Sequence, residues 1–375
     1  MLIAGEASGD LLAAELVSAL REQLPDAQFF GAGGARMAGA GVELAVDMTQ
    51  HAVVGIPSLG KYLKLRRLGG DLLALAVKRQ PDVVIGVDYG GFNLRFGHAV
   101  KEYGRTNPFS NWTPKIVQFV SPQVWASRPG RARQIAADYD LLLSIFPFEK
   151  AWYAQRVPQL RVEFVGHPMI GRFQNSDFRF QQSETTAAPT NILLLPGSRR
   201  SELNNHLPVM LNALKLIQEK APNVRAKMVL PNPELLQLAE SLGAKVEIQI
   251  GELPWALAGS HVAMASTGTV TMECALFGVP TVTLYKKPLL GLALALRIIT
   301  VKSLTMPNLL ADGEVFPEFL QKAATPENLA RAALELLLDG PRRKNIQSQL
   351  AKIIASLGEP GAPRRAAAAI LSLLN

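Results

Sequence analysis

The chain has 375 residues, of which 48% are hydrophobic and 19% are charged, and its net charge is +8. A chain of this length and composition is expected to form two well-packed domains and not to be disordered. The single cysteine, Cys274, excludes a disulfide within the chain and a zinc site built from cysteines. The five histidines show no metal-ligand spacing, so no metal site is predicted.

Short apolar segments alternate with helical patterns along the chain. The segments predicted as strands are nearly all apolar, which is typical of parallel strands buried on both faces. After a short opening strand they cover residues 82–87, 115–120, 141–145, 191–195, 225–230, 261–265 and 281–285. Helices are predicted at 11–24, 206–220, 233–242, 270–277, 326–338 and 364–374. This alternation favours open, doubly wound α/β sheets, whose ligands bind beyond the carboxyl ends of the strands.

A change in composition divides the chain into two parts. Residues 173–190 are rich in Gln, Ser, Thr and Ala and lack apolar periodicity, which predicts an interdomain linker. We therefore expect a first domain at 1–172 and a second domain at 191–345. A helical tail at 346–375 is expected to pack back on the first domain.

The first residues lack the basic stretch of a signal peptide, and no run of about eighteen uncharged apolar residues occurs, so a cytoplasmic location is expected. Residues 59–75 place leucines at helical spacing among lysines and arginines, which indicates a basic amphipathic helix, divided at Gly69 and Gly70. Such a helix either lies in a membrane interface or turns its apolar face to the core. The leucines concerned are Leu59, Leu63, Leu68, Leu72 and Leu75.

Two loops that contain carboxylates follow predicted strands in the first half of the chain. One runs from Gly5 to Asp10 and includes Glu6, and its glycines permit a tight turn before a helix. The other begins at Asp88 and ends at Asn93. A carboxylate in either loop can accept a proton from a sugar hydroxyl, although each loop is also compatible with a simple capping turn.

Two loops in the second half of the chain are suited to phosphate. In residues 196–202 a glycine loop opens a helix and offers backbone N–H groups to an anion, and Arg199 adds a guanidinium that fits a diphosphate. Residues 266–273 combine hydroxyls with Gly268 and end on Glu273, whose carboxylate can accept hydrogen bonds from a ribose. Polar residues at 306–310 and 317–321 are compatible with contacts to a base or sugar, or with a surface loop.

Taken together, these segments resemble the lipid-A-disaccharide synthase family. The resemblance rests on GEASGD at 5–10, VSPQVWA at 120–126, FPFEKAWY at 146–153, FVGHP at 164–168, LPGSR at 195–199, GTVTME at 268–273, PNLL at 307–310 and PEFLQ at 317–321. It implies an α/β fold of the GT-B type, in which two Rossmann-like domains with parallel sheets face each other across a cleft. The C-terminal domain would bind the donor nucleotide.

The resemblance also implies a reaction. This is the inverting transfer of 2,3-diacylglucosamine from UDP-2,3-diacylglucosamine to the 6-hydroxyl of 2,3-diacylglucosamine 1-phosphate (lipid X), which gives the β-1,6-linked lipid A disaccharide 1-phosphate and UDP. No metal or cofactor is implied. Because both substrates carry acyl chains, the resemblance implies a peripheral position at the cytoplasmic face of the inner membrane, with contact through the leucines of residues 59–75.

The resemblance also implies roles for individual residues, at the positions where this sequence matches the motifs of the family. Arg199 is assigned to the diphosphate and Glu273 to the ribose. The full set assigned to the UDP-sugar is Gly197, Ser198, Arg199, Gly268, Thr269, Glu273, Asn308, Glu318 and Gln321. The general base cannot be transferred, because Gly91 stands where some relatives have an aspartate. We favour Asp88 as the base, with Glu6 and Asp10 as alternatives.

Three other functions are compatible with parts of the sequence. A UDP-N-acetylglucosamine 2-epimerase of the same fold needs neither lipid nor acceptor, and the leucine-rich basic segment and the VSPQVWA string argue against it. A non-catalytic nucleotide-sugar-binding membrane module is compatible with Gly91 in place of an acidic residue. Nucleic-acid binding has only the net charge in its favour, because no basic stripe is interleaved with aromatic residues. The sequence does not indicate an oligomeric state.

Overall fold

The computed structural model describes residues 1–48, 59–107, 109–172, 191–287 and 301–374. The chain divides into two compact units, the first made of Met1–Arg172 with Leu357–Asn375 and the second of Phe173–Ser356. The linker predicted at 173–190 lies outside the described residues.

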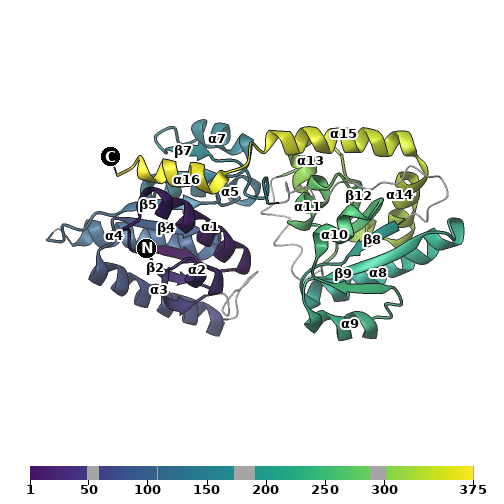
Figure 1. Ribbon diagram of the computed structural model, residues 1–375, viewed down its shortest axis with the longest axis horizontal. Coiled ribbons are helices and arrows are strands. Elements are labelled where there is room, and N and C mark those ends of the chain that lie inside the picture. Colours follow the sequence, from purple (N-terminus) through teal and green to yellow (C-terminus); the bar gives the residue numbers. More distant parts are fainter. Residues whose placement is uncertain (49–58, 108, 173–190, 288–300, 375) are drawn as a thin grey trace. The chain divides into compact units, whose positions relative to one another are not determined.

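The first unit is built on a seven-stranded parallel sheet with the order β3-β2-β1-β4-β5-β6-β7 (Figure 1). Its strands are β1 (Leu2–Ala4), β2 (Phe30–Gly33), β3 (Glu43–Asp47), β4 (Val83–Val87), β5 (Lys115–Phe119), β6 (Leu141–Ser144) and β7 (Val162–Phe164). Its helices are α1 (Ala7–Gln23), α2 (Ala35–Gly39), α3 (Leu59–Arg79), α4 (Gly90–Thr106), α5 (Val124–Ser127), α6 (Arg131–Asp138), α7 (Pro147–Ala154) and α16 (Ala362–Leu371).

The second unit repeats this plan with a six-stranded parallel sheet in the order β10-β9-β8-β11-β12-β13. Its strands are β8 (Asn191–Leu195), β9 (Arg225–Leu230), β10 (Glu247–Ile250), β11 (Val262–Ser266), β12 (Thr281–Tyr285) and β13 (Glu318–Leu320). Its helices are α8 (Arg200–Lys220), α9 (Leu236–Ser241), α10 (Leu253–Ala258), α11 (Val270–Leu276), α13 (Met306–Ala311), α14 (Pro326–Leu338) and α15 (Gly340–Ser356), with short 3-10 helices η3 (Pro233–Leu235) and η4 (Gln321–Ala323).

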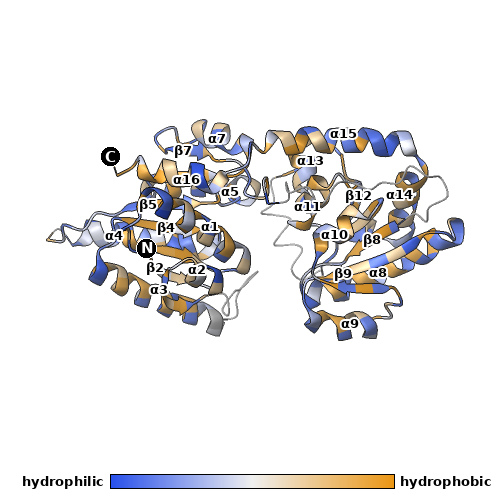
Figure 2. Cartoon of the chain, in the orientation of Figure 1, coloured by the Kyte–Doolittle hydropathy of each residue, from blue (hydrophilic) through white to orange (hydrophobic). Residues whose placement is uncertain are grey.

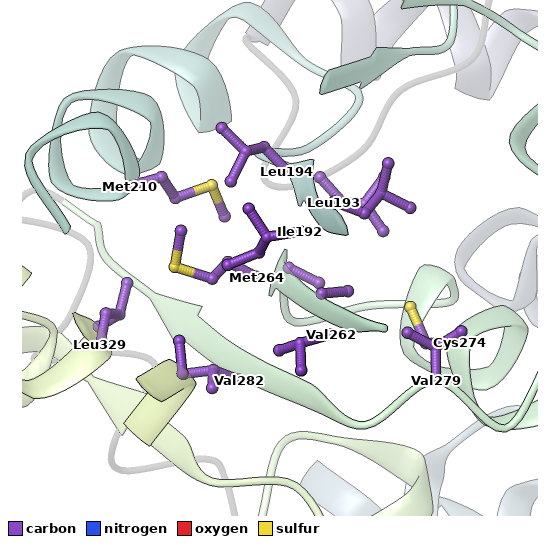
Figure 3. Close-up of a cluster of buried hydrophobic side chains, with 14 of the residues drawn as sticks. Ile192, Leu193, Leu194, Met210, Val262, Met264, Cys274, Val279, Val282 and Leu329 are labelled. Atoms are coloured by element: carbon purple, nitrogen blue, oxygen red, sulfur yellow. The ribbon is translucent and has the colours of Figure 1, made fainter. Parts of the chain in front are cut away.

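The central strands are apolar because helices cover both faces of each sheet. In β8, Ile192, Leu193 and Leu194 are all buried. Met210 of α8 and Met264 of β11 belong to the same core (Figure 3). The colouring by hydropathy follows this arrangement, with apolar residues along the strands and polar ones on the outer faces of the helices (Figure 2). The predicted α/β architecture with two Rossmann-like domains is therefore confirmed.

Both sheets reverse their strand order at one place. In the first sheet β1 pairs with β2 on one side and β4 on the other, and in the second β8 lies between β9 and β11. In open α/β sheets, ligands bind at the carboxyl ends of the strands that flank such a reversal. The loops after β1, β4, β8 and β11 are therefore the places where a site is expected in each unit.

The edges of the sheets were missed in the sequence. Strands β2, β3, β7, β10 and β13 were not predicted. Strand β2 is buried but has glycine at two of its four positions, β7 contains Glu163, and β3, β10 and β13 are partly exposed. These strands therefore lack the continuous apolar run that marks a central strand. Helix α3 also runs unbroken through Gly69 and Gly70.

The predicted tail boundary at residue 346 is wrong. That position is Ile346, within α15, and Ile346, Leu350 and Ile353 are buried in the core of the second unit. Because this helix is continuous to Ser356, only the segment from Leu357 belongs to the first unit.

Helix α16 packs on α1 in the first unit (Figure 1). Its Ala366, Ala367 and Ile370 are buried, and the Nε atom of Arg365 donates a hydrogen bond of 2.8 Å to the carbonyl of Val165. The last helix is therefore an integral layer of a domain whose other elements lie near the start of the chain.

Ile370→Ala is expected to destabilise the first unit by about 2 to 5 kcal/mol, because it leaves a cavity under α16. The measurement is urea unfolding followed by circular dichroism. Leu374→Ala is the matched control, since Leu374 is 47% exposed and its truncation is expected to change stability by less than about 0.5 kcal/mol. Equal effects of the two substitutions would contradict the packing of α16.

Candidate functional site

The loops after β1 and β4 meet at the reversal point of the first sheet. A Cβ atom on Gly5 would lie 2.2 Å from the ring of Tyr89, and one on Gly9 would lie 3.5 Å from the Cβ of Asp88. Only glycine fits at position 5, because the aromatic ring occupies the space of a side chain. The structure thus brings together the GEASGD loop and the loop that begins at Asp88.

Asp88 is held in an unusual backbone conformation at this point. Asp88 and Tyr89 have φ angles of 51° and 44°, in the left-handed region that non-glycine residues rarely adopt. The carbonyl of Asp88 accepts hydrogen bonds from Asn93 Nδ2 (2.8 Å) and Gln118 Nε2 (2.9 Å), and its N–H donates to the carbonyl of Phe119 (2.8 Å). These contacts hold the backbone of Asp88 in this conformation.

Burial raises the pKa of the Asp88 carboxyl above its ordinary value, and a hydrogen bond from the Tyr89 backbone partly opposes this. A general base works best when its pKa lies near the operating pH, so this shift favours proton transfer. Glu6 precedes α1 as its N-cap residue and is partly buried. Both carboxylates therefore remain candidates for the base.

Asp10 has a different role, and its proposal as a base is not supported. Its carboxylate accepts hydrogen bonds from the N–H groups of Gly34 (2.7 Å), Arg36 (2.9 Å) and Met37 (3.1 Å), and the residue is buried. These donors are the free backbone groups at the start of α2. Because its oxygens are occupied by the cap, Asp10 is a structural residue.

A buried polar cluster beside the carboxyl ends of β5 and β6 was not predicted. Glu149 accepts hydrogen bonds from Trp125 Nε1 (2.9 Å) and from the N–H of Phe146 (3.2 Å), and the hydroxyl groups of Ser121 and Tyr153 lie 3.3 Å apart. Burial raises the pKa of Glu149 to about 7. The available signal was a carboxylate within the mostly apolar and aromatic string at 146–153, close to a tryptophan in the string at 120–126.

In the second unit the first phosphate-type loop follows β8 directly. Arg199 is the N-cap residue of α8, and its guanidinium contacts the carboxylate of Glu202 at 2.7 Å. The same carboxylate accepts the N–H of Ser198 at 2.8 Å. Gly197, with a φ angle of 125°, leaves room for the Glu202 side chain, since a Cβ at position 197 would lie 2.5 Å from that side chain. The loop therefore already presents its donors to an anion, in this case the protein's own carboxylate.

The second phosphate-type loop follows β11, which pairs with β8. Gly268 and Thr269 are exposed, and Glu273 is partly buried in α11. The Thr271 hydroxyl donates to the carbonyl of Gly268 at 2.7 Å, which fixes the turn. Because neighbouring parallel strands end at the same edge, both loops lie on one rim of the sheet.

His206 connects this rim to β12 and was missed in the sequence. The buried imidazole lies between the carbonyl of Pro196, 3.0 Å from Nδ1, and the N–H of Lys286, 3.1 Å from Nε2. A carbonyl only accepts and an N–H only donates, so these partners assign a neutral ring protonated on Nδ1. Burial lowers the pKa of His206, in agreement with that assignment.

Two residues assigned to the UDP-sugar have structural partners instead. The amide of Asn308 donates to the carbonyl of Phe316 (2.9 Å) and accepts the N–H groups of Val315 (2.9 Å) and Phe316 (2.8 Å), and the residue is buried. Glu318 accepts the N–H of Leu304 at 2.7 Å and the hydroxyl of Ser303. The two side chains join α13 to β13, so direct contact of Asn308 with a nucleotide is not supported.

Gln321 differs from these two because it has an unused donor. Its Oε1 atom accepts the N–H of Lys287 at 3.3 Å, whereas its buried Nε2 atom has no acceptor among the described residues. Its φ angle of 51° is also in the left-handed region. Gln321 therefore stays a candidate for a polar ligand contact.

The predicted membrane-facing leucines fall into different environments along α3. Leu72 is buried in the core, and Leu68 and Leu75 pack against it, so membrane contact by Leu72 is contradicted. Leu63 is 54% exposed, next to the exposed ring of Tyr62. The side chain of Leu59 lies outside the described residues. Within the described part of the chain, no helix is both long and apolar enough to span a membrane, and no cluster of three metal-binding side chains occurs.

The raised pKa of Glu149 predicts a pH-dependent stability of the first unit. Unfolded, this carboxyl titrates near 4.5, so its contribution is complete below that pH and is lost as the pH rises towards about 7. The loss amounts to at most about 3 kcal/mol. Urea midpoints at pH 5 and pH 8 are compared between the unaltered chain and its variants, because the buried N-terminus and His167, whose pKa values are lowered, shift stability in the opposite direction over the same range. Glu149→Gln should remove only the Glu149 contribution, so its midpoint should change with pH differently from that of the unaltered chain, whereas the exposed control Asp26→Asn should follow the unaltered chain. Identical pH dependence in Glu149→Gln and the unaltered chain would refute the assignment.

One family of known proteins matches almost the whole chain. The family model described as "Lipid-A-disaccharide synthetase" matches residues 1–371. The lipid-A-disaccharide synthase of Myxococcus xanthus is 35% identical over 383 residues, which cover 100% of this chain and 97% of that protein. The protein of the same name from Solibacter usitatus is 37% identical over 388 residues, with the same coverage.

Solved structures share the fold at low sequence identity. A complex of S. aureus MnaA with UDP has a TM-score of 0.64 at 14% identity and covers 100% of this chain and 96% of that one. The calicheamicin glycosyltransferase CalG4 has a TM-score of 0.59 at 15% identity and covers 100% and 97%. These likenesses show the fold alone. The full-length sequence matches show the family: the chain belongs to the lipid-A-disaccharide synthetase family.

Proposed function

We propose that the chain transfers 2,3-diacylglucosamine from UDP-2,3-diacylglucosamine to the 6-hydroxyl of lipid X, releasing the β-1,6-linked lipid A disaccharide 1-phosphate and UDP. The family membership supports this reaction. The observation that carries it concerns the two reversal points. Two phosphate-type loops, one of which contains Arg199, lie at the reversal point of the second sheet, and Asp88, a carboxyl with a raised pKa, lies at that of the first.

In this proposal the second unit binds the UDP donor. The diphosphate displaces the Glu202 carboxylate from Arg199 and from the N–H of Ser198, since both contacts suit any anion. Gly268 and Thr269 form the second wall, and Glu273 accepts hydrogen bonds from the ribose hydroxyls. As the bond between the sugar and UDP breaks, the leaving diphosphate gains negative charge, which Arg199 stabilises.

In this proposal the first unit binds the acceptor and supplies the base. Asp88 takes the proton of the 6-hydroxyl while the oxygen attacks the anomeric carbon on the face opposite to UDP, so the configuration inverts. The bonding electrons leave with the diphosphate, and the proton ends on the Asp88 carboxylate. The raised pKa of Asp88 makes it a better proton acceptor than an ordinary aspartate.

We also propose that the chain acts at the cytoplasmic face of the inner membrane. The start of α3 exposes Tyr62 and Leu63 together with Lys64, Arg66 and Arg67. Aromatic and leucine side chains next to basic ones favour a surface that combines acyl chains with anionic headgroups. This arrangement is suited to substrates that stay partly embedded in the bilayer.

The two alternative functions make different demands. An epimerase requires no acceptor alcohol, and its support is limited to likeness in fold at 17% identity or less. A non-catalytic binding module would bind UDP without turnover. The family match and the base candidate favour the synthase over both.

Arg199→Ala is expected to lower disaccharide formation by at least about 100-fold, because it removes the charge that stabilises the leaving diphosphate. The measurement is conversion of radiolabelled lipid X with UDP-2,3-diacylglucosamine in mixed micelles that contain EDTA. The exposed neighbour Arg200 provides the control Arg200→Ala, which should retain activity. UDP binding without product in the unaltered chain would overturn the synthase assignment in favour of a binding module.

Asp88→Asn is expected to reduce kcat by about 100-fold or more while UDP affinity is unchanged, because the amide cannot accept the proton. Calorimetric titration with UDP and initial rates separate the two effects. Full turnover by this variant would transfer the role to Glu6, and Glu6→Gln tests that assignment in the same assay.

A further inference from the structure

Three arginines gather on the rim of the first sheet. Arg95 lies in α4, Arg131 is the first residue of α6, which packs against α4, and Arg128 precedes it. Partial burial and repulsion from the charges of Arg128 and Arg95 lower the pKa of Arg131, so Arg131 lies within electrostatic range of both. We call these residues the arginine cluster.

Within the described ranges of the chain, the cluster has no acidic partner. In the part of the chain that the structure describes, none of its guanidinium groups contacts an aspartate or glutamate, whereas Arg105 on the same α4 is paired with Glu102 at 2.6 Å. The guanidinium of Arg95 instead lies over the ring of Tyr62, 5.4 Å from its centre. Like charges held together without a counter-ion repel one another, and an external anion relieves that repulsion.

The cluster lies close to the candidate base. Arg95 follows Gly90 by five residues, about 7 to 8 Å along the axis of α4, and Asp88 precedes that helix by two residues. A Cβ atom on Gly90 would lie 3.1 Å from the Cβ of Pro122, so α4 begins against the loop that leads to Arg128. The candidate base and Arg95 therefore belong to one strand–loop–helix unit, with Arg95 in the second turn of the helix that follows the base.

Apolar surface adjoins the cluster. Tyr62, whose ring lies under the guanidinium of Arg95, is 38% exposed, and its neighbour Leu63 is 54% exposed. A ligand that fits both features combines an anionic group with acyl chains. A phosphate monoester suits the charge, since it carries about −1.5 to −2 at pH 7 and accepts several hydrogen bonds from guanidinium groups.

We propose that Arg95, Arg128 and Arg131 bind the phosphate monoester of the acylated acceptor and so place its far hydroxyl at Asp88. The inference rests on the proposed function. The cluster then determines acceptor choice: it distinguishes a sugar phosphate from the same sugar without phosphate, because only the phosphate neutralises the three charges.

The test compares lipid X with its dephosphorylated form, 2,3-diacylglucosamine, in neutral mixed micelles. Arg131→Gln is expected to raise KM for lipid X by about 10-fold or more with little change in kcat, and to leave KM for the dephosphorylated acceptor unchanged. Arg95→Gln should act in the same direction. Arg133→Gln is the matched control, because Arg133 is an exposed residue of the same helix outside the cluster.

A second measurement separates this inference from the proposed reaction. Equilibrium binding of radiolabelled lipid X requires no turnover, so weaker binding by Arg131→Gln supports the phosphate site even if the transfer reaction is not observed. An equal effect on both acceptors would overturn it. So would a loss limited to binding of phosphatidylglycerol vesicles, relative to phosphatidylcholine vesicles, with the preference for lipid X intact, because the cluster would then contact lipid headgroups.

Discussion

Every paired strand in the two sheets runs parallel to its neighbours, so each connection has to return over a face of the sheet. With helices on both faces, the first strand of each sheet lies in the middle, and the strand order reverses beside it. That reversal leaves space between successive connections at the carboxyl ends. The positions of Asp88 and of Arg199 both follow from this constraint, since each lies in a loop directly after a strand next to a reversal.

The rim of the first sheet stores backbone strain. Asp88, Tyr89 and Val120 all have positive φ angles, and a branched residue such as Val120 is seldom found there. Such conformations cost about 1 to 3 kcal/mol each and persist only where the surroundings hold them. The side chains of Asn93 and Gln118 do so from α4 and β5 by binding the carbonyl of Asp88. The backbone that bears the Asp88 carboxyl is thereby held in place.

The sequence was sufficient to predict the strands and loops that depend on a local residue pattern. Central strands such as β8 were found because they contain a continuous run of buried apolar residues. The loops that follow them were found because a strand end, a glycine and a charged residue stand together. The resemblance to a known family was sufficient to predict the type of fold of the chain. The outer strands, whose residues are partly exposed, carried no comparable signal.

Side-chain roles were less predictable, because they depend on partners distant in the sequence. Asp10 and Asn308 look like ligand-binding residues in their motifs, yet Asp10 caps a helix that begins 25 residues later, and Asn308 binds the backbone of Val315 and Phe316. His206 was overlooked since its partner, Lys286, is 80 residues away. Spacing indicates which residues share a loop, but not which of them the fold itself uses.

The two candidate anion sites differ in how their charge is held before a ligand binds. Arg199 is already neutralised by Glu202, and because its side chain is 49% exposed that pair contributes at most about 1 kcal/mol, so a diphosphate replaces the carboxylate at little cost. The arginine cluster has no such partner among the residues that the structure describes, and an external anion would relieve its repulsion. The first arrangement favours reversible exchange of a leaving group. The second favours selection, because a ligand without an anion gains nothing there and leaves the three charges unpaired.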